Sequence, residues 1–173
     1  TQEPDALRNM QAELDFSGST KAVNFTGLQV VLDHSTLDGR LAIESFDPLQ
    51  LSFDLAIDTL NLDHYALIPA TADSAEVGGA GLAVGSMLLF TGGGKIAIGH
   101  LVSDGLTATD FEVTLRSNAN EIRLFPMSSR FYGGQHQGDV RIAFGTTQPL
   151  LTVNQMVTGF EASTLFRDMA GTD

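Results

Sequence analysis

The feature that most constrains this chain is a regular alternation of apolar and polar residues along most of its 173 positions. In the segment 49–57 every odd position is apolar, whereas Ser52 and Asp54 occupy even positions. The same period of two recurs at 10–16, 28–32, 37–43, 96–98, 111–115, 122–124, 140–144 and 151–153. Successive side chains of a β-strand point to opposite faces, so these segments predict strands with one apolar and one wet face.

Short polar turns separate these segments, which is typical of an antiparallel meander. The expected fold is therefore mainly β: a curved antiparallel sheet, half-open barrel or sandwich-like, forming a single domain over 1–173. Two short helices are expected, one at 63–67 and a terminal amphipathic one at 161–170. Residues 70–85, rich in Ala, Gly, Ser and Thr, predict a flexible connector. A change of parity near Thr109 and Asp110 predicts a β-bulge.

Charge and composition exclude several classes of function. Nine basic against 21 acidic residues give a net charge of −12, so no nucleic-acid partner is expected. No apolar run approaches the ~20 residues of a membrane helix, so this fragment is not expected to insert into a membrane. The absence of cysteine excludes disulfides, thiolate zinc sites and cysteine nucleophiles.

No motif predicts an enzyme, a cofactor or a metal site. The segment 92–97 fits G-x-G-x-x-A, but alternation follows it where a dinucleotide site needs a helix, so a hairpin turn is predicted instead. The four histidines are isolated, and Asp54 and Asp58 share the wet side of one strand. No G-x-S-x-G is present. An enzyme with a carboxylate cleft stays a rival, which would require two buried, facing acids with raised pKa values.

The apolar side of the strands is the candidate functional feature, and two interpretations stay open. It is either a closed core, which would make the domain a scaffold for protein interactions, or a partly uncovered groove. A ten-residue strand spans ~33 Å, so two short helices are little cover for a whole sheet face. The candidate groove is lined by Leu28, Val30, Leu32, Leu41, Ile43, Leu51, Phe53, Leu55, Ile96, Ile98, Phe111, Val113, Leu115, Ile122, Leu124, Val140 and Ile142.

Several motifs resemble those of the AsmA family. The segment 51–65 is similar to the family's L-x-F-D-L-x-L-D-x-L-D-L-D-R-Y, with Asn61 for its usual Asp and His64 for its usual Arg. The segment 124–138 resembles L-x-P-x-x-A-x-L-Y-G-G-x-x-x-G, in which Tyr132, Gly133 and Gly134 are expected to form a structural turn. The segment 157–171 resembles the family's closing G-v-x-x-x-x-L-L-x-D-x-A-G.

The resemblance implies a periplasmic domain whose parent chain is anchored in the inner membrane of a Gram-negative bacterium. It also implies a role in outer-membrane biogenesis, with phospholipid carried between the two membranes along an apolar β-groove. The expected partners are phospholipid and neighbouring domains of the parent chain or other envelope proteins. The direction of transport, the headgroup and the energy source do not follow from these motifs.

Overall fold

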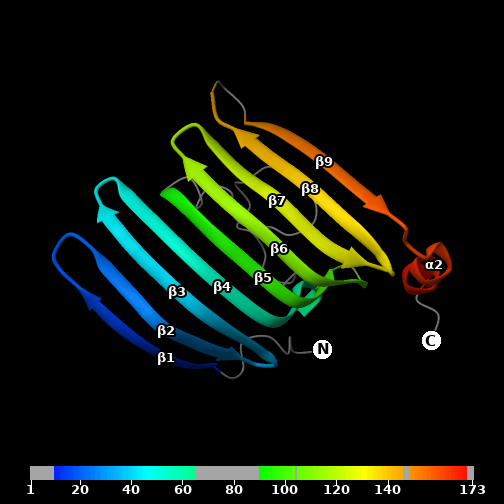
Figure 1. Ribbon diagram of the computed structural model, residues 1–173, viewed down its shortest axis with the longest axis horizontal. Helices are drawn as coiled ribbons and strands as arrows, with labels where there is room; N and C mark the ends of the chain where they lie inside the picture. Colours follow the sequence, from blue (N-terminus) through cyan, green and yellow to red (C-terminus); the bar gives the residue numbers. More distant parts are fainter. Residues whose placement is uncertain (1–9, 65–89, 104, 146–148, 171–173) are drawn as a thin grey trace, which may run out of the picture.

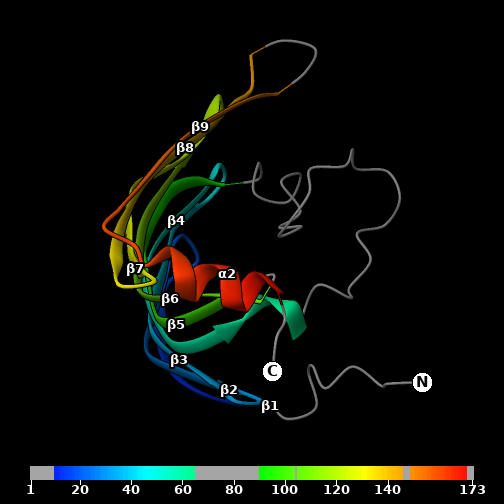
Figure 2. The ribbon, with the colours of Figure 1, turned by 90° about the vertical axis from the view of Figure 1, so that its right-hand side faces the viewer.

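The computed structural model describes residues 10–64, 90–103, 105–145 and 149–170, and within them one curved sheet of nine strands (Figures 1 and 2). The strands follow one another across the sheet in chain order. They are β1 (Met10–Gly18), β2 (Val23–Leu32), β3 (Ser35–Phe46), β4 (Leu49–Asn61), β5 (Thr91–Ser103), β6 (Leu106–Asn118), β7 (Glu121–Phe131), β8 (Gly134–Ala143) and β9 (Leu150–Thr158). The expectation of a mainly β fold built on a curved sheet is confirmed.

The sheet is mixed, because β4 and β5 run parallel while every other neighbouring pair is antiparallel. The expected antiparallel pairing thus holds at every junction of the described sheet except this one. Parallel strands cannot be joined by a two-residue turn, so a crossover must connect them. That crossover runs through residues 65–89, which lie outside the described residues, and so does the predicted connector at 70–85.

One α-helix is described, α2 (Ala162–Ala170), where the terminal helix was predicted. The other expected helix is a single 3-10 turn, η1 (Leu62–His64). The backbone N–H of Glu161 donates to the carbonyl oxygen of Tyr132 at 2.7 Å, which ties the start of α2 to the β7–β8 turn. Figure 2 shows α2 on the concave side of the sheet, and α2 contacts β6.

Bulges keep the apolar residues on one face where the alternation slips. In β2 the register shifts between Phe25 and Leu28, and Gly27 in that bulge has φ of 59°. In β6 the register against β7 shifts between Thr109 and Glu112, and Asp110 has φ of 51°. The bulge predicted from parity near Thr109 and Asp110 is thus confirmed. The extra residue in each bulge returns the following apolar side chains to the same face of the sheet. Without it they would point to the opposite face.

The glycines at 92–94 lie inside β5, so the predicted hairpin turn is wrong. A Cβ atom on Gly94 would overlap the carbonyl oxygen of Phe53, and one on Gly93 would overlap the carbonyl oxygen of Leu115. The residues after Gly94 continue β5, whereas a dinucleotide site needs a helix at that position. These glycines are required by the close approach of β5 to its two neighbours, which sequence spacing alone does not reveal.

The Tyr132–Gly134 segment forms the β7–β8 connection. Tyr132 and Gly133 are its two turn residues, with φ of 47° and 80°, a conformation that suits a tight hairpin. Gly134 begins β8 and is buried, and a Cβ atom there would lie 2.6 Å from the backbone nitrogen of Phe160. The segment therefore seats the chain that leads from β9 into α2.

Substitution of Gly94 by Ala should lower the free energy of unfolding by about 2–3 kcal/mol, because the new methyl group would be forced into the β4 backbone. Gly145→Ala is the matched control, since a Cβ atom there meets nothing within 4 Å. Urea unfolding followed by circular dichroism measures both variants. Equal stabilities of the two would contradict the close approach.

The apolar face as candidate functional site

The register of the sheet places all seventeen candidate groove residues on one face. Ile96, for example, pairs with Leu55 on one side and with Val113 on the other, and Leu124 pairs with both Leu115 and Val140. Directly paired residues project from the same face of a sheet. Side chains far apart in the sequence thus form a continuous apolar face across β2–β8, which we call the apolar face.

Further apolar residues extend this face beyond the candidates named from the sequence. They share its register on the inner strands and on both edge strands: Met10, Ala12, Phe16, Phe25, Leu37, Ile57, Met127, Leu151 and Val153. The sequence pattern did not assign Phe25 to this face, because the bulge at Gly27 puts Phe25 out of step with the alternation at 28–32. Leu151 and Val153 alternate clearly in the sequence, but only the register shows that they continue the face beyond Val140 and Ile142.

Burial identifies the apolar face with the inside of the curve. The smallest exposed fractions of its apolar residues are those of Ile98 (6%), Val113 (7%), Leu115 (5%) and Ile122 (2%). Glu112 and Arg116, whose side chains project from the opposite side of β6, are exposed. Side chains crowd on the concave side of a curved sheet and spread apart on the convex side. Figure 2 shows how strongly the sheet curves.

Toward the two edges the apolar face is uncovered. Every residue of β1 and β9 is exposed. On β1, Met10 and Phe16 keep 75% and 72% of their surface, and on β9 Leu151 and Val153 keep 48% and 52%. Within the described residues no second sheet faces this one. Large apolar surface left in contact with water marks a place where a ligand or a partner binds.

One polar chain crosses the apolar face near the β7–β8 turn. The Ser129 hydroxyl lies 3.1 Å from Nδ1 of His136, whose Nε2 contacts Oε1 of Gln155. With a proton on Nε2, the imidazole accepts from Ser129 and donates to Gln155, so each group finds a partner. Ser129 is 8% exposed, and this chain satisfies it while joining β7, β8 and β9.

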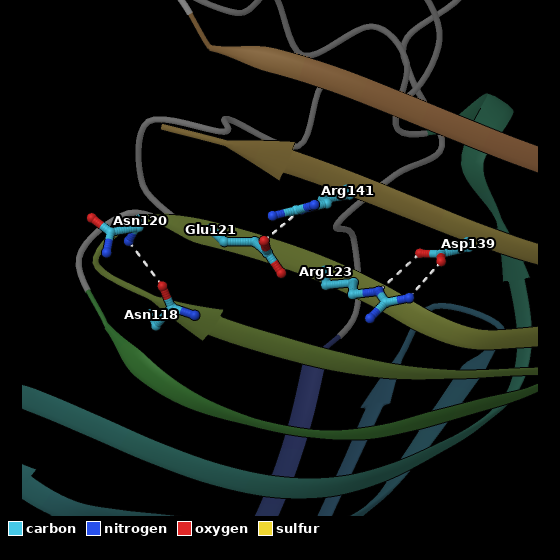
Figure 3. A network of polar contacts seen from close by, with 6 residues as sticks. All are labelled: Asn118, Asn120, Glu121, Arg123, Asp139 and Arg141. Carbon is cyan, nitrogen blue, oxygen red and sulfur yellow. Dashed lines mark hydrogen bonds and ion pairs between the residues drawn. The ribbon is translucent and has the colours of Figure 1, made fainter. Parts of the chain in front are cut away.

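The opposite face is charged and carries paired ions. Arg123 makes two hydrogen bonds to Asp139 on the next strand, at 3.1 Å and 2.6 Å, and Arg141 pairs with Glu121 (Figure 3). The guanidinium of Arg123 also lies 4.6 Å from the ring centre of Phe125. These contacts let a sheet with one apolar side present a well-solvated other side, which we call the polar face.

Two carboxylates are held in their charged form. The hydrogen bond from Arg123 lowers the pKa of Asp139. A hydrogen bond from the backbone N–H of Thr36, at 2.7 Å, lowers the pKa of Asp58. Both shifts run opposite to the raised pKa values that a carboxylate-cleft enzyme would require. Asp58 and Asp139 therefore do not fit the role that this rival assigns to its carboxylates.

Comparisons with protein-family models, with curated proteins and with solved structures find no match. Among the helices of the described residues, none has the length and apolar character needed to cross a membrane.

The ion pair of Asp139 predicts a pH dependence of stability. A carboxylate whose folded pKa lies below its ordinary value of 3.8 adds stability above that value and loses it as the pH falls toward the folded pKa. The urea midpoint should therefore drop as the pH falls below the ordinary pKa of 3.8, and drop less in Asp139→Asn. Glu44→Gln removes an exposed carboxylate that forms no ion pair with the described residues, so it serves as the control. Identical pH profiles for wild type and Asp139→Asn would refute the assignment.

Proposed function

We propose that the apolar face binds the acyl chains of phospholipid, as part of an AsmA-like periplasmic protein that carries phospholipid between the inner and outer membranes. The observation that supports this most directly is the continuous apolar face, uncovered at both edge strands. The motifs at 51–65, 124–138 and 157–171 supply the family resemblance. In this proposal the domain is not an enzyme, and its parent chain is anchored in the inner membrane.

The dimensions of the sheet suit such a ligand. Nine strands about 4.8 Å apart give an apolar face ~38 Å wide across the strands. Acyl chains lying across the strands would contact apolar side chains of successive strands, and among the described residues the polar chain of Ser129, His136 and Gln155 interrupts this face. That polar chain sits close to the β7–β8 turn, at one margin of the face. Apolar contact without directional bonds allows a lipid to slide, because burial energy depends on area and not on orientation.

The charges of the molecule agree with a lipid that keeps its headgroup in water. Among the described residues, charged side chains such as Arg40, Asp54 and Glu112 project from the polar face, so they do not interrupt the apolar rows. A phosphate or amine headgroup would remain at the margin of the sheet, where hydration is retained.

The alternative is a scaffold that binds neighbouring domains or envelope proteins. The exposure of both edge strands favours it, since an unpaired edge is a template for strand addition. The two functions differ in what the apolar face contacts. A conduit holds lipid on that face, whereas a scaffold needs only its edges.

Native mass spectrometry of the chain purified from cells should reveal bound phospholipid. Val153→Asp should reduce the lipid-bound fraction by about tenfold, because it would place a carboxylate against acyl chains. Thr152→Asp is the matched control, since residue 152 pairs with Arg141 on the polar face. A lipid-free wild type, or equal loss in both variants, would favour the scaffold.

In the parent protein, Phe53→Asp should impair the outer-membrane barrier of cells, because it would interrupt the middle of the apolar face. Ala56→Asp adds the same charge to the polar face of the same strand and should have little effect. Barrier function is measured by sensitivity to large hydrophobic antibiotics, after circular dichroism has shown that both variants fold. Normal resistance in a folded Phe53→Asp strain would remove this residue from the path.

A further inference from the structure

The polar face contains a shallow hollow over β2–β6 that the lipid proposal does not use. Its volume is about 480 Å³, and a second hollow of about 430 Å³ adjoins it and shares Gly94 and Thr114. We call the two together the polar-face hollow. Volumes of this size lie within the range of sites for small molecules.

Small side chains make the hollow. Ala42, Ser52 and Gly93 are consecutive cross-strand partners on β3, β4 and β5, so three adjacent strands lack a large side chain at the same level. Arg116 of β6 continues this row beside Gly93. The floor is therefore low, and longer side chains stand around it.

Those longer side chains are mostly cationic. The charged residues lining the hollow are Arg40, Lys95, Arg116 and one acid, Asp54. Arg40 pairs with Asp54 at 2.8 Å, while Lys95 and Arg116 form no ion pair with any described residue. Three cations and one carboxylate give a local charge of +2 in a chain whose net charge is −12.

The register brings Lys95 and Arg116, which form no ion pair within the described part of the chain, close together. Lys95 pairs with Thr114, and Arg116 lies two residues further along the same strand. Such diagonal neighbours are about 7–8 Å apart, within joint reach of one small anion. On the far side of Arg116 the row continues with Arg123 and Arg141, which are already neutralised by Asp139 and Glu121 (Figure 3). Of the three arginines in this row, Arg116 alone forms no ion pair with a described residue, so it is the one available to an anion from outside the protein.

We propose that the polar-face hollow binds a phosphate monoester through Lys95 and Arg116, with hydroxyl groups of Ser52 and Thr114 as further donors. A monoester carries a charge of about −1.5 to −2 at neutral pH and three acceptor oxygens, which match the local charge of +2. A single carboxylate would need only one of the cations, as Asp54 does with Arg40. The site lies on the polar face, opposite to the apolar face, so it does not rest on the proposed function.

The test is a titration of the ¹⁵N-labelled chain with glycerol phosphate, followed through the amide signals of Ser52 and Gly93. We expect saturable shifts that acetate does not produce. The double variant Lys95→Gln/Arg116→Gln should weaken binding by about tenfold or more, since charge-assisted hydrogen bonds are lost. The control, Lys21→Gln/Arg130→Gln, removes the same charge away from the hollow and should change affinity less than twofold.

A second arm identifies the source of the phosphate. Binding to phosphatidic acid vesicles but not to phosphatidylcholine vesicles, lost in the hollow variant, indicates a lipid headgroup. Binding of glycerol phosphate without vesicle binding indicates a soluble phosphate ester. The absence of saturable shifts with glycerol phosphate, or equal weakening in the two double variants, would overturn the proposal.

Discussion

The constraint on which the rest of the structure depends is that nine consecutive strands present most of their large apolar side chains to one face of a single sheet. Where local geometry breaks the period of two, a bulge restores it, as Gly27 does in β2 and Asp110 in β6. A slip of one residue without such a bulge would turn half a strand inside out. Face segregation therefore accounts for the positive φ of Gly27 and Asp110, which lie in these two bulges.

This segregation leaves the molecule with a concave apolar side and a convex charged side. On the convex side, polar side chains face water and form cross-strand ion pairs such as Arg123–Asp139. This side therefore needs no second layer of structure to cover it. On the concave side, the central strands bury Val113 and Ile122 while the edges leave Phe16 and Val153 in water. This face is buried at its centre and open at its margins. Such a surface fits the binding of an elongated apolar ligand better than it fits the role of a closed core.

The alternation predicted the strands, the bulge near Asp110 and the common face of the groove candidates, because side-chain period is a local property. What depends on neighbouring strands was not predictable. The glycines at 92–94 look like a turn until the backbones of β4 and β6 are seen against them. The parallel pairing of β4 with β5 and the clustering of Lys95 with Arg116 likewise arise only from register. The exposure of Leu151 and Val153 depends on the lack of a described neighbour beyond β9.

The central claim is that the apolar face, and not the polar one, accepts acyl chains. The most direct measurement is methyl NMR of the labelled chain with a phospholipid that carries a nitroxide near the end of its acyl chain. Signals of Ile98, Leu115 and Val153 should broaden strongly, whereas the methyl groups of Ala56 and Ala97, which pair with each other on the polar face, should broaden less. Equal broadening of both sets, or broadening of neither, would contradict the account.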